Sequence, residues 1–302
     1  MKSLLPMWIF ITSLSTVFTP AQCKERNYES SRTPIIFEKN VTIEEHFINS
    51  VQNSLSENKN FQDFVFQHVA LPQRNGKLII PENINHIKID IGLSYSAPIS
   101  QYWLQQESDL IVFGFEPNPN SVASIRNGAI KRHPSHGVTL DPKHVNVDFF
   151  LIPCALGLSK AKMVKFYITK EDCGCSSLYE PSYFEVENII DVPVFSLSDF
   201  FDIFPFNTHP IVEYIKIDAQ GSDLDIVKSA GSYLKDHVIY ITIECENTYY
   251  KNTMNSEHDV ESYMNQIGFQ RHTTDDTDDP TYINSRYLEY VKENPIKIYQ
   301  KG

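Results

Sequence analysis

Two carboxylates stand where two neighbouring strands of a predicted sheet end. The stretch HIKIDIGLS alternates Ile with polar side chains and reaches Asp90 just before Gly92, a pattern typical of a buried strand followed by a tight turn. The stretch LIVFGFE predicts a second strand that ends in Glu116. A helix is predicted between them over residues 98–106. Together these elements indicate a βαβ unit.

The position of these carboxylates suggests a nucleoside ligand. In open α/β sheets, ligands bind beyond the carboxyl ends of the strands, and an acidic residue after the second strand commonly binds a ribose diol. The glycines that would let a pyrophosphate approach the following helix are missing, because Ser94 and Ser96 stand in their place. This favours S-adenosylmethionine as the ligand and disfavours a nicotinamide-dependent oxidoreductase.

Two more carboxylates follow later predicted strands. Asp218 comes after the apolar stretch IVEYIKI, and Glu244 comes after VIYITI. Because the carboxyl ends of parallel strands meet at one edge of a sheet, we expect Asp90, Glu116, Asp218 and Glu244 to converge on one crevice. A cationic ligand would offset the repulsion between them, and the sulfonium of S-adenosylmethionine is a cation.

Length and composition limit the class of protein. A chain of 302 residues with 41% hydrophobic residues can bury one good-sized core. The net charge of −12 disfavours nucleic acid and anionic membranes as partners, since both require an excess of Lys and Arg. The Cys173–Cys175 pair lacks a second Cys or His pair at suitable spacing, so no metal site is predicted. Further elements are predicted as strands at 149–157, 164–169, 268–272 and around 287–291, and as helices at 42–56, 61–70, 119–128, 223–230 and 258–267.

The first 23 residues indicate a secretory signal. They combine one Lys, a short apolar run and small residues near Ala21, which is typical of a signal peptide cleaved after Ala21 or Cys23 or, alternatively, of an uncleaved signal anchor. We therefore expect location in the secretory pathway, and no stable membrane insertion unless the signal stays uncleaved. Residues 24–84 would form a linker and extra helices, and residues 85–302 the main domain. If cleavage follows Cys23, the cysteines that remain, whose pairing stays open, are Cys154, Cys173, Cys175 and Cys245.

Several sequence blocks together resemble the FkbM family of S-adenosylmethionine-dependent methyltransferases. The resemblance covers roughly residues 85–290, and the order and spacing of the blocks make it more specific than any single motif. It implies an α/β fold of the Rossmann-like class I methyltransferase type, with a mostly parallel seven-stranded sheet, helices on both faces and the last strand antiparallel. The blocks are DIG at Asp90, FEPNP from Phe115, PCALG from Pro153, CSSL from Cys175, IKIDAQGSDLDIVKSAG from Ile215 and IECE from Ile243.

The resemblance also implies roles for single residues. Asp90 and Gly92 would lie near the methionine part of the cofactor, with Ser94 in the turn that follows. Glu116 would bind the ribose hydroxyls with Asn118 close by, and Asp218 would stand near the methyl group and its acceptor. The residues that would border the adenine are Cys154 and Ala155. The family usually reads D-x-G-A-N-x-G and has Glu before the later glycine, whereas this chain has Leu93, Ser94, Ser96 and Gln220 at those places.

The expected chemistry is O-methylation of a hydroxylated small molecule or glycan, the kind of acceptor that named members of the family mostly use. Alignment of donor and acceptor can supply up to roughly 7–11 kcal/mol of the barrier in ideal cases. Asp218 or Glu244 would remove the hydroxyl proton, or would only orient neighbouring groups. The alternative is a catalytically inactive fold acting as a secreted binding module, because S-adenosylmethionine is made in the cytosol.

Overall fold

The computed structural model describes residues 60–128, 138–158, 162–170, 174–272 and 279–298. The predicted signal segment 1–23 and the predicted helix 42–56 lie outside these residues. Asn40, which the sequence Asn40-Val41-Thr42 marks as a possible N-glycosylation acceptor, lies outside them too. All described residues belong to the same compact unit.

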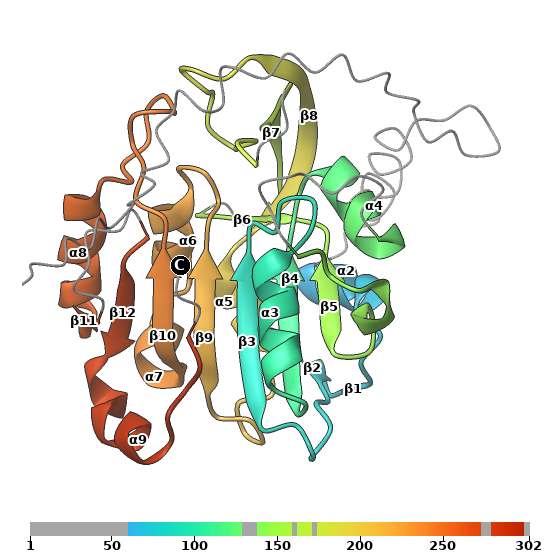
Figure 1. Cartoon of the computed structure of the whole chain (residues 1–302), viewed down its shortest axis with the longest axis vertical. Coiled ribbons are helices and arrows are strands. Elements are labelled where there is room, and N and C mark those ends of the chain that lie inside the picture. The colour runs from blue at the N-terminus through green and yellow to red at the C-terminus, as the bar shows by residue number, and fades with distance from the viewer. Residues whose placement is uncertain (1–59, 129–137, 159–161, 171–173, 273–278, 299–302) are drawn as a thin grey trace, which may run out of the picture. The chain divides into compact units, whose positions relative to one another are not determined.

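A seven-stranded sheet forms the centre of this unit (Figure 1). The strands lie in the order β11-β12-β10-β9-β3-β4-β5, and the pairs β10–β9, β9–β3, β3–β4 and β4–β5 are parallel. The last strand, β12, runs antiparallel to both of its neighbours. The mostly parallel sheet predicted from the sequence is therefore confirmed. The strands are β3 (His86–Ile91), β4 (Leu110–Phe115), β5 (Phe149–Ile152), β9 (Val212–Ile217), β10 (Val238–Ile243), β11 (Phe269–Arg271) and β12 (Thr281–Asn284).

Helices cover both faces of this sheet, and each face has its own hydrophobic core. On one face, Phe61 of α2, Phe200 of α5 and Val260 of α8 pack with the Ile residues of β3. On the other face, Trp103 of α3 and Val122 of α4 pack with Val112 of β4. The helices are α2 (Phe61–His68), α3 (Pro98–Gln106), α4 (Pro119–Asn127), α5 (Leu197–Ile203), α6 (Asp223–Ser229), α7 (Tyr233–His237), α8 (Glu257–Gln266) and α9 (Leu288–Glu293), with short 3-10 turns η2 (Pro142–His144) and η3 (Ser285–Tyr287). Among the described helices, none has the length and apolar character needed to cross a bilayer.

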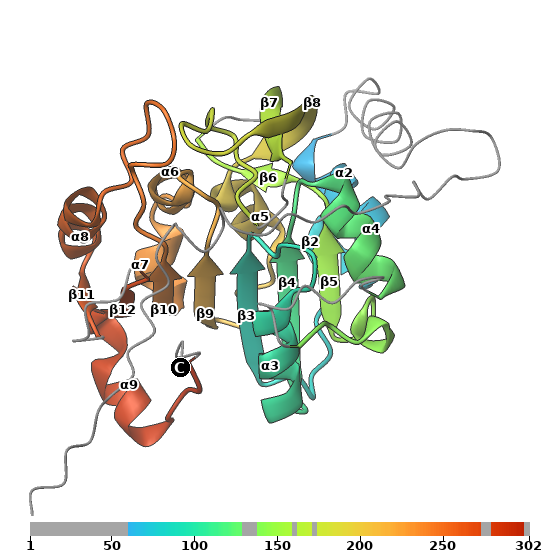
Figure 2. The ribbon, with the colours of Figure 1, turned by 45° about the horizontal axis from the view of Figure 1, so that its top comes forward.

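A second, three-stranded sheet lies beyond the carboxyl ends of the central strands (Figures 1 and 2). It consists of β6 (Ala155–Leu156), β8 (Val186–Phe195) and β7 (Lys162–Thr169), in that order. The strand predicted over residues 149–157 is split, because Pro153 has no N–H to donate and the chain turns there into β6. A separate hairpin pairs β1 (Gln73–Arg74) with β2 (Lys77–Leu78).

Candidate active site at the carboxyl edge of the sheet

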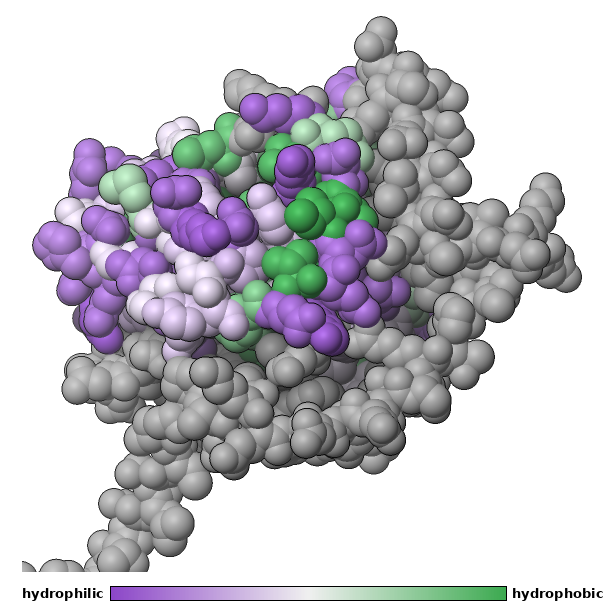
Figure 3. Space-filling view, turned by 90° about the horizontal axis from the view of Figure 1, so that it is seen from above, coloured by the Kyte–Doolittle hydropathy of each residue, from purple (hydrophilic) through white to green (hydrophobic). Residues whose placement is uncertain are grey.

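A cavity opens between the carboxyl ends of β3, β4 and β9 and the loops around the three-stranded sheet. Figure 3 looks down on this side of the molecule, where hydrophobic and hydrophilic residues are interleaved. Nucleoside ligands bind at this edge in open α/β sheets. Its lining includes Gly92, Ser94, Phe115, Glu116, Asn118, Cys154, Ala155, Phe166, Gly174, Ser176, Asp218, Gln220 and Ser222.

The floor of the cavity is formed where the ends of β3 and β9 touch. Gly92 has a φ of +81°, and a Cβ added there would lie 1.8 Å from the carbonyl oxygen of Asp218. The Asp218 N–H donates to the carbonyl of Ile91 at 2.9 Å. A glycine is required at position 92, because any side chain would push the two strand ends apart.

Glu116 lies at the end of β4, buried in the cavity wall. Its Oε2 accepts a hydrogen bond from the N–H of Leu93 at 3.1 Å, and its Oε1 accepts one from the N–H of Asn118 at 2.8 Å. Burial raises the pKa of Glu116 to about 7, although these backbone donors act in the opposite direction. Each carboxylate oxygen can still accept a further hydrogen bond from a ligand.

Two serine hydroxyls in the cavity lining are buried without a hydrogen-bond partner among the described residues. They belong to Ser94, which has a φ of +53°, and to Ser222. Buried polar groups are nearly always paired in folded proteins, so an unpaired hydroxyl that borders a cavity indicates a polar ligand there. The backbone at Gly174 approaches Ser94, since a Cβ added to Gly174 would lie 3.4 Å from its Oγ.

The remaining cofactor residues predicted from the sequence also line this cavity. The Asn118 side chain accepts a hydrogen bond from the N–H of Asn120 at 3.0 Å and so caps α4. Cys154 is buried, and burial raises the pKa of its thiol, so it is a neutral, apolar part of the wall next to Ala155.

Asp90 differs from the expectation, because it is buried but is not part of the cavity lining. Its Oδ2 accepts a hydrogen bond from the Ser100 hydroxyl of α3 at 2.6 Å. Its Oδ1 has no partner in the part of the chain that the structure describes. Asp90 pairs in register with Lys216 of the neighbouring strand. Burial raises the pKa of Asp90, and the charge of Lys216 opposes this shift.

Asp218 is held as an anion at the cavity. The Lys216 ammonium donates to its Oδ2 at 2.8 Å, and the Gln220 amide donates to its Oδ1 at 2.7 Å. Burial opposes ionisation, but the Lys216 charge and these hydrogen bonds outweigh it and lower the pKa of Asp218 to about 2. The side chain remains 35% exposed and can therefore reach a ligand.

Glu244 stands behind Asp218 and does not line the cavity. Its Oε2 accepts from the same Gln220 amide at 2.7 Å, so one side chain bridges the two carboxyls. Burial and the negative charge of Asp218 raise the pKa of Glu244 well above its usual value. The two carboxyls thus differ, since the charge of Lys216 favours the ionised form of Asp218, whereas burial and the charge of Asp218 favour the protonated form of Glu244.

The predicted convergence of four carboxylates on one crevice is therefore only partly right. Glu116 and Asp218 line the cavity, whereas Asp90 and Glu244 lie outside its lining. The protein itself relieves the repulsion, because Lys216 supplies a positive charge and the surroundings of Glu244 favour its protonated form.

Three residues that organise this region were missed by the sequence reasoning as parts of the site. Lys216 and Gln220 hold Asp218, and Asp223 shapes the turn after it. The Asp223 carboxylate accepts from the N–H groups of Ala219 at 2.7 Å and Gly221 at 3.0 Å. A Lys inside the buried run IKI was the available signal, since a buried cation needs a partner.

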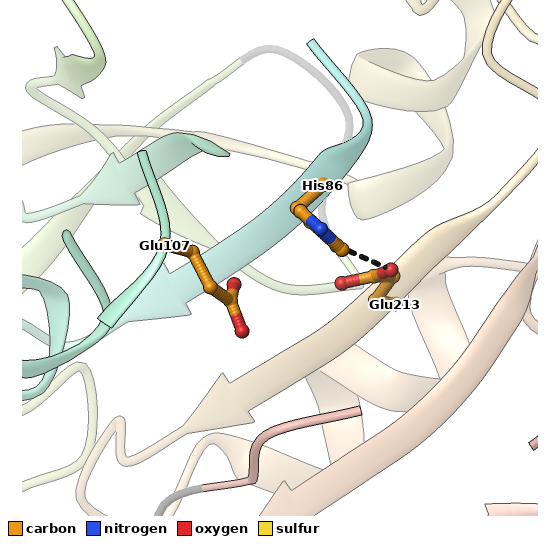
Figure 4. Close-up of side chains that lie close together, drawn as sticks. All are labelled: His86, Glu107 and Glu213. Carbon is orange, nitrogen blue, oxygen red and sulfur yellow. Dashed lines mark hydrogen bonds and ion pairs between the residues drawn. The ribbon is translucent and has the colours of Figure 1, made fainter. Parts of the chain in front are cut away.

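A second polar cluster lies at the opposite, amino end of β3 and β9 (Figure 4). His86 Nδ1 lies 2.8 Å from Oε1 of Glu213, and Glu107 lies nearby, so that ligand atoms of all three residues fall within 4.8 Å of one another. The buried Lys88 ammonium already donates to Glu107 at 2.7 Å. Lys88 thus supplies a positive charge to this cluster.

Comparison with known proteins identifies the family. The family profile described as Methyltransferase FkbM domain matches residues 93–271, which is more than half of the chain. The matched region contains the strand ends and loops that form the cavity, apart from Ile91 and Gly92 at the end of β3. Searches of curated proteins and of solved structures gave no match. The chain belongs to the FkbM methyltransferase family.

Proposed function

We propose that this protein transfers the methyl group of S-adenosylmethionine to a hydroxyl oxygen of a small molecule or glycan. One observation carries the proposal: a single cavity at the carboxyl edge is lined by the buried carboxylate of Glu116, the ionised Asp218 and the unpaired hydroxyls of Ser94 and Ser222.

The residues of the cavity fit this cofactor. Glu116 would hold the ribose diol with its remaining acceptor sites, and Ser94 and Ser222 would gain hydrogen-bond partners. Cys154 and Ala155 offer an apolar surface for the adenine. When bound, the cofactor supplies a methyl group on a positively charged sulfur.

On the acceptor side, Asp218 would orient the hydroxyl and take its proton. Two fixed donors, Lys216 and Gln220, hold the carboxylate in place, so that it presents an acceptor at a defined position. Its low pKa makes it a weak base, so the proton would move to Asp218 only as the new O–C bond forms and the bond between the methyl group and sulfur breaks. The proton would then pass to water, and the sulfur would leave as a neutral thioether.

Isothermal titration with S-adenosylmethionine tests the cofactor assignment. We expect micromolar binding by the full chain and loss of binding in Glu116→Ala. No binding at millimolar cofactor would contradict an enzyme and would favour the alternative, a secreted module of methyltransferase fold that only binds. Transfer of label from methyl-tritiated donor into a glycan or lipid fraction would then identify the acceptor class.

We also place the protein in the secretory pathway, on the basis of the sequence of residues 1–23 and the acceptor at Asn40. Expression in eukaryotic cells followed by glycosidase treatment checks this placement. We expect glycosidase treatment to increase the electrophoretic mobility of the protein, and we expect no such change for Asn40→Gln. A cytosolic protein that retains residues 1–23 would contradict it.

A further inference from the structure

The polar cluster at the amino end of β3 and β9 brings three metal-binding side chains together (Figure 4). His86 is the first residue of β3, Glu213 lies in β9, and Glu107 directly follows α3. One ligand atom of each side chain lies within 4.8 Å of those of the other two. The sequence did not predict a metal site here, because the three residues belong to elements that are distant along the chain.

Glu213 has a carboxylate oxygen that indicates a ligand at this point. Its Oε1 lies 2.8 Å from Nδ1 of His86, whereas its Oε2 is buried and has no hydrogen-bond partner among the residues described. The side chain is 8% exposed. Figure 4 shows one oxygen of this carboxylate beside His86 and the other turned toward Glu107. Buried carboxylate oxygens are normally paired, so a group that binds Oε2 between these side chains is expected.

The carboxylates of this cluster outnumber its lysine. Glu107 and Glu213 are joined by Asp109, whose Oδ1 lies 3.7 Å from Nε2 of His86. Lys88, which donates to Glu107 at 2.7 Å, supplies one positive charge against these three carboxylates. A divalent cation would balance the two negative charges that remain when His86 is neutral.

The ligand atoms favour zinc over calcium. Imidazole nitrogen and carboxylate oxygen are both common zinc ligands, whereas calcium takes about six to eight oxygens. The ligand atoms of a tetrahedral zinc are roughly 3.5 Å apart, so the side chains would close by about 1 Å. The His86 side chain is 36% exposed, which lets water reach the fourth position. Lys88 would hold Glu107 in place from outside, as hydrogen-bonded partners of ligating carboxylates do.

We propose that His86, Glu107 and Glu213 bind a zinc ion, with water as the fourth ligand. The ion would replace the hydrogen bond between His86 and Glu213 and would tie the amino ends of β3 and β9 to the end of α3. Its role is to stabilise the fold, because the cavity lies at the opposite end of these strands. The inference goes beyond the proposed function and does not depend on it, since zinc binding and S-adenosylmethionine binding are measured separately.

The test measures zinc binding by the full chain after a chelator has removed bound metals. Equilibrium dialysis against zinc chloride, followed by elemental analysis, gives the stoichiometry and the affinity. We expect one zinc ion per chain, and affinity at least about tenfold weaker in His86→Gln and in Glu213→Gln. His144→Gln is the matched control. His144 Nδ1 also lies 2.8 Å from a carboxylate oxygen, that of Asp148, but His144 belongs to no such three-residue cluster among the described residues.

Thermal unfolding gives a second measurement, because a ligand that binds the folded chain raises the midpoint temperature. Zinc should raise the Tm of the natural chain and of His144→Gln, and should not raise that of His86→Gln. His86 is partly exposed at the first position of its strand, so His86→Gln should fold. A melt without zinc checks this.

Several results would contradict the zinc site. They are absence of zinc binding, equal zinc affinity in His86→Gln, or a preference for calcium over zinc. A thiolate charge-transfer band after cobalt is added in place of zinc would also contradict it, since this band would place the metal on cysteines. Absence of zinc binding would assign a proton to Oε2 of Glu213, because burial raises the pKa of this carboxyl.

Discussion

The two ends of the central strands β3 and β9 carry similar charges and use them differently. At the carboxyl end, Lys216 pairs with Asp218 beside a cavity, and Asp218 is 35% exposed. At the amino end, Lys88 pairs with Glu107, and their side chains are 0% and 9% exposed. Lys88 also lies 5.6 Å from the Trp103 ring and donates to a backbone carbonyl.

This difference shows that the type of charged residue does not reveal its role. Both lysines are buried cations with a carboxylate partner, so a list of charges would not separate them. Access to the cavity does separate them, because only a carboxylate that lines the cavity can meet a ligand there. We therefore expect changes at the carboxyl end to affect methyl transfer and changes at the amino end to affect stability.

Replacement of the proposed proton acceptor should have the largest effect. Asp218→Asn keeps the shape of the side chain but removes its charge, and we expect methyl transfer to fall by roughly 10²–10⁴-fold. Single-turnover assays with labelled donor measure this loss. Glu213→Gln, a matched change at the amino end of β9, is the control and should leave methyl transfer unchanged. Near-normal turnover by Asp218→Asn would contradict the role assigned to Asp218.

Removal of the amino-end cation should chiefly destabilise the fold. Lys88→Met leaves the Glu107 carboxylate buried without its partner, which costs roughly 3–5 kcal/mol in such cases. Urea unfolding measures the change. Lys216→Met should cost less, because Asp218 can reach water, and the double variant Lys88→Met/Glu107→Leu should recover much of the loss. Equal losses of stability in Lys88→Met and Lys216→Met would contradict this difference between the two ends of the strands.

Cofactor affinity should rise with pH through the titration of Glu116. Its pKa is raised to about 7, so it is neutral below this pH and ionised above it, and the ionised form is the better partner for a cationic ligand. We expect affinity to be about tenfold weaker at pH 6 than at pH 8. Glu116→Gln should flatten the profile. A slope that persists unchanged in this variant would assign the titration to Asp223, whose pKa burial also raises to about 7.

The smallest expected effect is on cofactor affinity, when one of two unpaired serine hydroxyls is removed. The hydroxyls of both Ser94 and Ser96 are buried and lack a partner among the residues described, but only Ser94 lines the cavity. Ser94→Ala should weaken S-adenosylmethionine binding by about two- to tenfold, the worth of one hydrogen bond. Ser96→Ala should leave calorimetric affinity unchanged. Equal effects would mean that the cavity contact of Ser94 is irrelevant.

The sequence predicted the central strands well, because they are buried on both faces and read as continuous apolar runs. The helix over residues 98–106 has the predicted bounds, since Pro98 fixes its start. The predicted final strand around residues 287–291 was wrong. The last strand is Thr281–Asn284, a short run of four residues, and the Tyr and Val that suggested a strand lie in η3 and α9.

Strand β8 was not predicted at all. Its outer half alternates exposed and partly buried residues, and Pro193 interrupts the apolar end, so it lacks the signal of a core strand. This omission matters, because β8 and its partners form the sheet beyond the cavity. Local sequence patterns predicted the strand ends that form the cavity floor. The three-stranded sheet beyond the cavity was missed, because it depends on contacts between distant segments.

The positions of Asp90 and Glu244 could not be derived from the sequence either. A carboxylate near a strand end is predicted to reach the crevice, yet Ser100 of α3 engages Asp90, and Gln220 comes between Glu244 and the cavity. Which way such a side chain turns depends on its hydrogen-bond partners, and those come from other elements.

The contact between Gly92 and the Asp218 carbonyl has an evolutionary consequence. With no room for even a methyl group there, the strand ends that carry the proposed cofactor and acceptor residues meet at one rigid contact, and neither can move without disturbing the other. A change in acceptor preference is therefore expected to come from substitutions elsewhere in the cavity lining.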